Sequence, residues 1–146
     1  MTISSGAAVF QYGTQVTCIS DSSAIADSAF NAGTVTALVQ SDLCPLGDAV
    51  LDITMAVAPV AGSSIHLYRR DMNIDGVNDA TVPDANFKNV YVGSFPLDLV
   101  TTQQYIPLTN IPLVVNQEFY LENDSGQSTT GTTVLKVTPK TYNAKA

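Results

Sequence analysis

Residues 71–79 have the spacing of oxygen ligands that is found in calcium-binding loops. Such loops place oxygen ligands at the first, third, fifth and ninth positions, a glycine at the sixth and a backbone carbonyl at the seventh. Here the glycine is Gly76, while the twelfth position, which usually holds a bidentate acid, is Val82. The ligands that this pattern predicts are Asp71, Asn73, Asp75, the carbonyl of Val77, and Asp79.

The same residues also suit a loop that binds no metal, because Asp, Asn and Gly stabilise turns through local hydrogen bonds. No helix is expected on either side of the loop, so it would not be an EF-hand. The cofactor prediction is therefore none, with calcium at this loop as the alternative.

His66 is the single histidine of the chain, and a Ser-His-Asp site would need it within hydrogen-bond reach of an activated hydroxyl. Ser63 and Ser64 are close in sequence, but no Gly-x-Ser-x-Gly turn surrounds them. We expect a strand histidine on the solvent face or at a subunit contact, and we assign no catalytic residue.

A pair of carboxylates could instead serve a glycosidase, which needs them across a cleft with aromatic walls. Glu118 and Glu122 share one face of an expected strand, and the chain contains no Trp. This arrangement suits a solvated surface better than a cleft. The sequence therefore predicts that the protein is not an enzyme.

The elements that must carry these residues follow from the composition. The chain has 146 residues, which suits one domain, and only 13% are charged against an average of about 25%. Its many Thr and Val residues are typical of half-buried strands. The net charge of -7 and the lack of a basic stripe argue against nucleic acid and against an anionic membrane surface.

The distribution of apolar residues bears on membranes and on the place of synthesis. No apolar run approaches the roughly 18 residues that a membrane-spanning helix needs. The first six residues lack the basic and apolar regions of a secretory signal, so we expect synthesis in the cytosol.

Periodicity predicts an all-β fold, an antiparallel β-sandwich or jelly roll of about eight strands. The clearest alternation runs over residues 49–58, with Leu51, Ile53, Met55 and Val57 on one face. Near-helical spacing over residues 22–31 predicts one short helix or, equally, a crossover loop. Pro107 and Pro112 confine their segments to sheet edges or to short pairings, and Pro139 is expected to end the last strand.

The expected organisation is a flexible N-terminal arm over residues 1–13, one β-sandwich domain over 14–139 and a frayed tail over 140–146. Cys18 and Cys44 are interpreted as small buried apolar residues, with a disulfide as the less favoured reading. The residues expected at an interface with a partner are Phe10 and Tyr12 in the arm and Asn78 in the acidic loop.

Three strings carry a resemblance to a known group. They are His-Leu-Tyr-Arg-Arg at 66–70, Tyr-Val-Gly-Ser-Phe-Pro-Leu at 91–97 and Phe-Tyr-Leu-Glu-Asn-Asp-Ser-Gly-Gln at 119–127. Together with Ile-Pro-Leu at 111–113 they resemble small structural proteins of tailed bacteriophages, over roughly residues 60–138. Proteins of this group are virion components such as capsid decoration or cement proteins, with no catalytic site.

The resemblance implies a non-enzymatic virion protein that stabilises a capsid shell by bridging neighbouring subunits. The implied partners are the major capsid protein or other virion proteins, and a homo-oligomer is expected, with closed symmetry. The implied location is the virion, after synthesis in the host cytoplasm. Two alternatives stay open: a tail, neck or baseplate component, and a calcium-dependent, adhesin-like surface-binding module.

Overall fold

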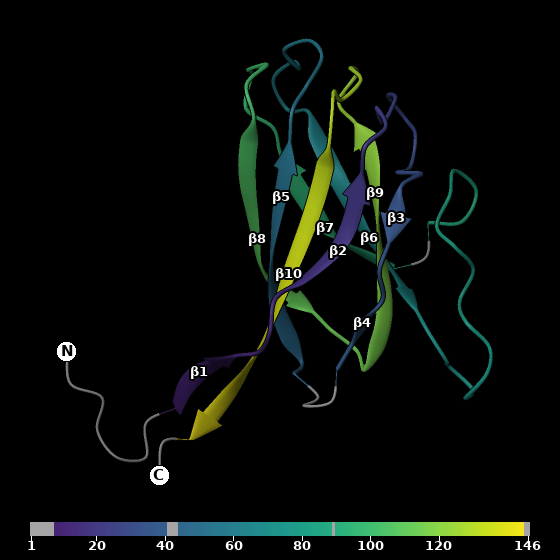
Figure 1. The fold of residues 1–146 in the computed structure, drawn as a ribbon, viewed down its shortest axis with the longest axis vertical. Coiled ribbons are helices and arrows are strands. Elements are labelled where there is room, and N and C mark those ends of the chain that lie inside the picture. Colours follow the sequence, from purple (N-terminus) through teal and green to yellow (C-terminus); the bar gives the residue numbers. More distant parts are fainter. Residues whose placement is uncertain (1–7, 41–43, 89, 145–146) are drawn as a thin grey trace, which may run out of the picture.

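The computed structural model describes residues 8–40, 44–88 and 90–144, and within these ranges it contains ten strands in two antiparallel sheets (Figure 1). The first sheet has the order β3 (Thr34–Val35), β2 (Val16–Asp21), β10 (Thr133–Ala144), β5 (Leu46–Ile53) and β8 (Gln104–Pro112), and β1 (Ala8–Tyr12) also pairs with β10. The second sheet has the order β4 (Leu38–Val39), β9 (Asn116–Asp124), β6 (Ser64–Asp71) and β7 (Val90–Pro96). The predicted all-β sandwich is confirmed.

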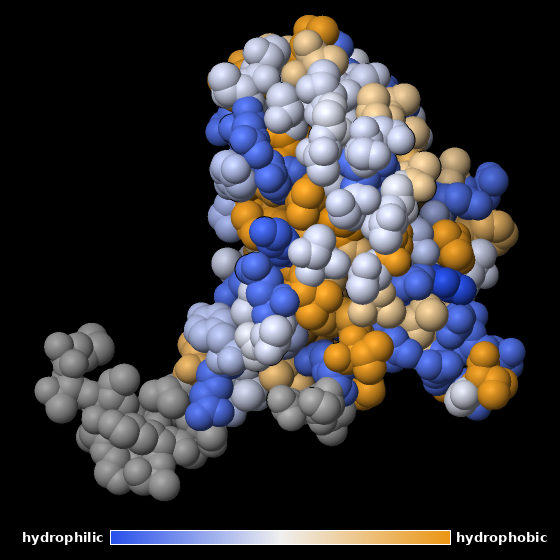
Figure 2. Space-filling model, in the orientation of Figure 1, coloured by the Kyte–Doolittle hydropathy of each residue, from blue (hydrophilic) through white to orange (hydrophobic). Residues whose placement is uncertain are grey.

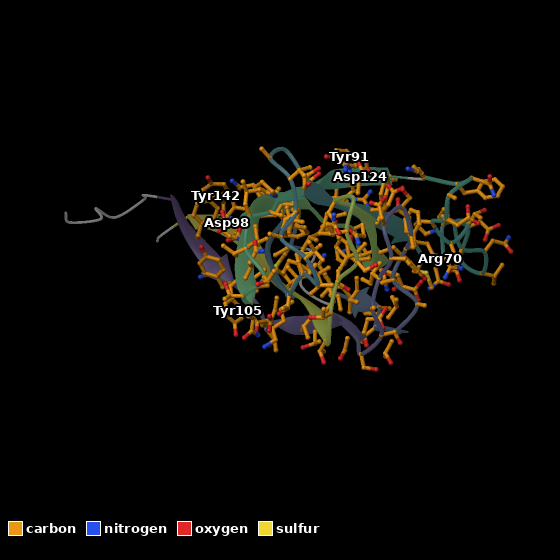
Figure 3. All side chains as sticks on the ribbon, turned by 90° about the horizontal axis from the view of Figure 1, so that it is seen from above. Arg70, Tyr91, Asp98, Tyr105, Asp124 and Tyr142 are labelled. Carbon is orange, nitrogen blue, oxygen red and sulfur yellow. The ribbon has the colours of Figure 1, made fainter. Side chains whose placement is uncertain are left out.

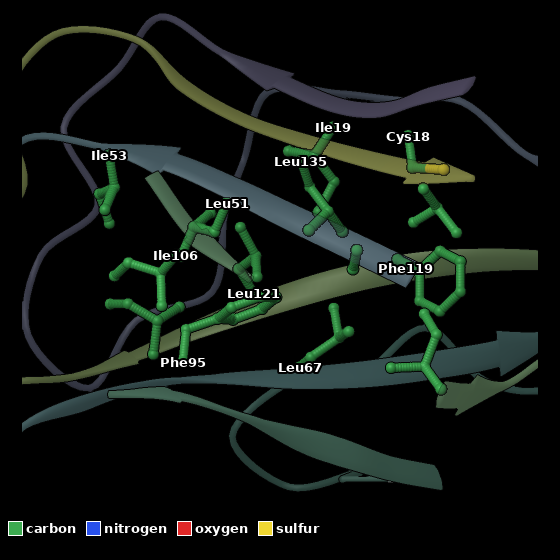
Figure 4. Packing of buried hydrophobic residues seen from close by; sticks show 14 of the residues in the cluster. Cys18, Ile19, Leu51, Ile53, Leu67, Phe95, Ile106, Phe119, Leu121 and Leu135 are labelled. Atoms are coloured by element: carbon green, nitrogen blue, oxygen red, sulfur yellow. The ribbon is translucent and has the colours of Figure 1, made fainter. Parts of the chain in front are cut away.

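The core lies between the two sheets and follows from the alternation of side chains along each strand. In β5, Ala49, Leu51 and Ile53 are buried while the residues between them are partly exposed. Phe95 from β7 and Phe119 from β9 are fully buried opposite them (Figure 4). Burial of side chains of this size stabilises the fold by about 1.5–3 kcal/mol each, so the period-two pattern is sufficient to choose the inner face.

Both cysteines are free and buried, in agreement with the reading as small apolar residues. Burial raises the pKa of the Cys18 thiol to about 12. In the described part of the chain nothing is helical, so no helix there could cross a membrane.

Residues 22–31 form a crossover loop, and the alternative of a short helix is wrong. Its backbone is bonded mainly to β9: the N–H of Ser28 donates to the carbonyl of Asn123, and the N–H of Asn31 donates to the carbonyl of Leu121. Within the loop a single turn bond runs from the N–H of Ala29 to the carbonyl of Ala26. Ser28 adopts a φ of 60°, which is incompatible with an α-helix. The loop therefore extends the second sheet before the chain passes to β3 of the first.

The strand expected over residues 49–58 ends at Ile53, and two residues later Met55 forms an isolated bridge with Thr129. Met55 is buried like Leu51 and Ile53, but Val57 is 54% exposed, so the prediction that Val57 shares their face is wrong. The chain turns away from the sheet after Met55, and period-two alternation no longer decides burial there.

Pro139 does not end the last strand, and residues 140–144 are not frayed. β10 continues to Ala144 and pairs with β1 over the full length of β1, from Ala8 opposite Ala144 to Tyr12 opposite Lys140. The carbonyl of Pro139 accepts a hydrogen bond from the N–H of Gly13 in the gap between β1 and β2. In a strand, N–H and C=O of one residue point to the same side, so the missing N–H of Pro139 faces this gap and the pairing of Pro139 with Gly47 of β5 is kept.

β1 and the part of β10 from Lys140 to Ala144 form a two-stranded ribbon that projects from one end of the sandwich, and we call this ribbon the arm (Figure 1). The expected N-terminal arm thus exists over residues 8–12, but it is a paired strand. Residues 1–7 and 145–146 of the predicted arm and tail lie outside the described residues.

Candidate functional site

The acidic loop between β6 and β7 is held by hydrogen bonds that its own carboxylates accept. Asp75 Oδ1 accepts the N–H groups of Val77 at 3.1 Å and Asn78 at 2.8 Å, and the Asn78 amide also donates to Asp75 Oδ2. Asp79 accepts the N–H of Asn73 at 2.8 Å. The bonds from Asn78 and then Val77 lower the pKa of Asp75. These contacts account for the Asx-type turn that the sequence allowed.

Two acids of the predicted calcium set, Asp71 and Asp79, lie beside arginine side chains. Asp71 Oδ1 lies 2.6 Å from Nε of Arg69, and Asp79 Oδ2 lies 3.6 Å from Nη2 of Arg70. Among the described residues, no three His, Cys, Asp or Glu side chains are grouped as they would be around a metal ion. The structure therefore does not assemble the predicted ligands, and calcium at this loop stays a prediction.

The outer face of the second sheet carries a dense polar cluster, because β6 and β9 are paired in a register that puts their polar residues opposite each other. Tyr68 donates its hydroxyl to Glu122 Oε2 at 2.9 Å, and Nζ of Lys88 lies 2.5 Å from Glu122 Oε1. The ring of Phe30, from the crossover loop, packs 5.5 Å from that of Tyr68. Burial, followed by the hydrogen bond to Glu122, raises the pKa of Tyr68 to about 12.

A second group of this cluster lies one pair further along the same strands. Glu118 Oε2 accepts hydrogen bonds from Nη1 of Arg70 and from the hydroxyl of Tyr120, both at 2.8 Å. Glu118 and Glu122 do share one face of β9, as the sequence indicated, and each is bonded to a tyrosine and a cation. Their oxygens are therefore committed to hydrogen bonds that join β9 to neighbouring segments.

His66 lies on this outer face beside Ser64 and Asp124. Its Nε2 atom is 3.2 Å from Ser64 Oγ and 3.3 Å from Asp124 Oδ2. In a Ser-His-Asp triad the hydroxyl and the carboxylate contact different ring nitrogens, because the acid must orient the base while the base takes the proton. Here both oxygens contact the same nitrogen, which is not the geometry of a triad. Ser63, which is buried and directly precedes β6, donates its hydroxyl to the carbonyl of Ser125.

The arm carries the exposed aromatic residues that the sequence placed at an interface. Phe10 is 42% exposed and Tyr12 is 61% exposed. Phe10 is opposite Tyr142, which is 60% exposed, and the two ring centroids are 4.1 Å apart. Since side chains alternate along strands, Phe10, Tyr12 and Tyr142 share one face of the arm. Figure 3 shows Tyr142 at the arm, away from Tyr91 and Asp124.

An ion pair fixes the root of the arm to the sandwich. Nζ of Lys140 lies 2.5 Å from Asp48 Oδ1, which also accepts the N–H of Asn110 at 3.0 Å. The Lys140 ammonium lies 5.0 Å from the centroid of the Phe10 ring, within the range of a cation–π contact. An ion pair therefore holds the base of the arm to the sandwich, whereas in the outer half of the arm β1 and β10 pair only with each other.

Sequence reasoning missed Tyr142 and an apolar groove at the same end of the sandwich. Tyr142 was missed because it lies in a short segment whose partner strand is more than a hundred residues away. The groove has a volume of about 480 Å³, and the exposed side chains of Val39, Ile74 and Val115 are on its walls. They come from β4, the acidic loop and the turn between β8 and β9, so only the fold brings them together. Orange apolar surface is visible at this end in Figure 2.

The predicted interface residue Asn78 lies in the exposed acidic loop, where it bonds to Asp75 through both its N–H and its side-chain amide. Its amide therefore has a structural role within the loop.

The chain matches no protein-family model, and searches of curated proteins and of solved structures return no match either.

Proposed function

We propose that the protein is a non-enzymatic structural component of a tailed-bacteriophage particle, a decoration protein that bridges neighbouring shell subunits. The observation that carries the proposal is the arm, which projects from the sandwich and carries Phe10, Tyr12 and Tyr142 on one face. A two-stranded ribbon is marginally stable in water, so a ribbon with an exposed aromatic face gains stability when a partner covers it.

The composition of the arm suits contact with another protein. Lys140 at the base of the arm is already paired with Asp48, and the rest of the arm includes no charged residue, so covering the arm removes little charge from water. Tyrosine and phenylalanine are enriched at the centres of protein interfaces, where they contribute a large contact area. The apolar groove lined by Val39, Ile74 and Val115 opens at the same end and offers a partner a second apolar surface.

The polar cluster on the second sheet supports a structural role for the remaining acids. Glu118 and Glu122 are bonded to tyrosines and cations, and His66 has both oxygen partners on one nitrogen. Such contacts stiffen a sheet that has to stay rigid in a shell. The sequence resemblance supplies the assignment to a phage particle.

The test is binding of the purified chain to capsids of the phage that encodes it, emptied of DNA and stripped of the chain. We expect co-sedimentation and a higher temperature of capsid disruption with the wild type. Replacing both arm rings, in the double variant Phe10→Ser and Tyr142→Ser, should abolish both effects. Tyr105→Ser is the matched control, because Tyr105 is an equally exposed tyrosine on β8, away from the arm. No binding by a folded wild-type chain would contradict the proposal.

The place and number of bound copies distinguish the decoration protein from a tail, neck or baseplate component. Electron cryomicroscopy of whole particles should show the chain at many equivalent positions over the shell. Density confined to one vertex or to the tail would favour the alternative.

A further inference from the structure

The outer edge of β1 differs from the other sheet edges that the structure describes. An exposed edge strand invites pairing with another chain, and proteins blunt such edges with very short strands, prolines or covering residues. β3 and β4 have two residues each, and β8 carries Pro107 and Pro112. β7 ends at Pro96, and a bulge interrupts its pairing with β6 between Leu67 and Tyr68, which is another way in which proteins blunt an edge. β1 has five residues, Ala-Val-Phe-Gln-Tyr, with no proline and no charge.

The backbone of β1 presents hydrogen-bonding groups to this edge. Gly13 donates to Pro139, and in an antiparallel pair the hydrogen-bonded and non-bonded positions alternate. Gln11 opposite Thr141 is therefore the next bonded pair. The N–H and C=O groups of Phe10 and Tyr12 consequently point to the other edge, where no described strand pairs with them.

The arm has a second open edge, but that edge is less suited to pairing. β5 ends its pairing with β10 at Leu46 opposite Lys140, so residues 141–144 have no described partner on that side. That open stretch covers four residues next to the end of β5, whereas β1 is open over all five of its residues.

We propose that β1 pairs antiparallel with β1 of a second copy of this chain across a two-fold axis. Two arms then form a four-stranded antiparallel sheet, which overcomes the marginal stability of each two-stranded ribbon. A second copy fits this edge because the edge is uncharged: two chains of net charge -7 meet where neither brings like charges together. The register that overlaps all five residues sets Phe10 opposite Phe10 of the second copy, in a self-complementary interface.

The pairing rests on the proposed function, in which the arm contacts a partner. It adds to that function the surface that joins two copies of the chain. Edge pairing leaves the aromatic face of each arm uncovered, so the four-stranded sheet presents Phe10, Tyr12 and Tyr142 from two chains together. A dimer would thus contact two neighbouring shell subunits at once.

The main experiment measures the mass of the isolated full-length chain by analytical ultracentrifugation over a range of concentrations, with no capsid present. We expect a reversible dimer of the 15.4 kDa chain. Tyr12→Pro removes an N–H that points to the open edge and keeps the pairing of β1 with β10, so the dimer should weaken by about tenfold or more. Tyr12→Ala is the matched control, because it also loses the ring but keeps the N–H, and it should stay closer to the wild type than Tyr12→Pro.

A second experiment does not depend on how well the proline variant folds. Phe10→Cys places a thiol directly opposite its own copy in the proposed register, so mild oxidation should give a disulfide-linked dimer on a non-reducing gel. Val57→Cys is the control, because Val57 is as exposed as the arm residues but lies in the turn after β5. Both native cysteines are buried and should not contribute.

A wild-type chain that stays monomeric at every concentration would overturn the pairing, and so would a Tyr12→Pro dimer as strong as that of Tyr12→Ala. Equal cross-linking of the two cysteine variants would also overturn it. A monomeric chain that still binds capsids would leave the proposed function standing without the pairing. A chain that dimerises but does not bind capsids would support the pairing and contradict the proposed function.

Discussion

Nζ of Lys140 lies 2.5 Å from Oδ1 of Asp48, and this ion pair ties the strand that forms the arm to β5 of the sandwich. The Lys140 side chain is only 5% exposed, although it sits at the point where β10 leaves the body of the molecule. The pair therefore decides how firmly the arm is positioned.

Replacing Lys140 should destabilise the protein more than replacing any exposed lysine. Lys140→Met keeps most of the aliphatic stem but leaves Asp48 without its cation, so we expect the free energy of unfolding to fall by about 1–3 kcal/mol. Urea denaturation measures this change. The control is Lys136→Met, at an exposed position of the same strand, which should change stability by less than about 0.5 kcal/mol. Equal effects of the two variants would contradict a stabilising role for the pair.

The same pair predicts a loss of stability in acid. Burial raises the pKa of Asp48, but the hydrogen bonds from Lys140 and Asn110 and the lysine charge outweigh it and lower this pKa below 3.8. A carboxyl with a lower pKa in the folded state contributes stability above its unfolded pKa and loses it as the pH falls through its folded pKa. The urea concentration at which half the protein is unfolded should therefore be lower at about pH 3 than at neutral pH. This decrease should be smaller in Asp48→Asn. A variant as acid-sensitive as the wild type would exclude Asp48 as a contributor.

Gly33 should not tolerate a side chain, because it lies against Asp21. An added Cβ would be 2.5 Å from the Asp21 Cα, and Asp21 Oδ2 accepts the N–H groups of Ala32 and Gly33. Gly33→Ala should lower the free energy of unfolding by about 3 kcal/mol, as expected for overpacking at a rigid contact. At Gly13 the nearest atom is at 3.5 Å, so Gly13→Ala should be nearly neutral. Thermal or chemical denaturation of both variants checks this, and a stable Gly33→Ala protein would contradict it.

The acidic loop should keep its conformation without a metal. Asp75 and Asp79 accept hydrogen bonds within the loop, and Asp71 is paired with Arg69, so calcium would have to displace these partners. We expect the Tm to be unchanged by a chelator or by millimolar calcium, because only a ligand that binds the native state raises it. A rise with calcium that magnesium does not reproduce, and that Asp75→Ala abolishes, would instead support the calcium-dependent binding module.

Local patterns predicted those parts of the fold in which one strand face is buried. The alternation expected over residues 49–58 matches β5 as far as Ile53, and the strand expected to carry Glu118 and Glu122 is β9. Alternation identifies such strands because a shift of one residue would expose every apolar side chain. Pro107 and Pro112 indicated an edge segment, and both are in the edge strand β8. Within the candidate site, Phe10 and Tyr12 were identified by type alone, as aromatic residues in an otherwise polar segment.

What the sequence determined, therefore, is the all-β class, the inner faces of the long strands and the low charge of the surface. The tertiary structure decided the partners: β1 with the end of β10, the crossover loop with β9, and Tyr68 with Glu122 beneath Phe30. Apolar periodicity is a local property of the chain and can be read along it. Backbone pairing between residues 90 or more positions apart depends on which edges the whole fold leaves open, and no local pattern carries that information.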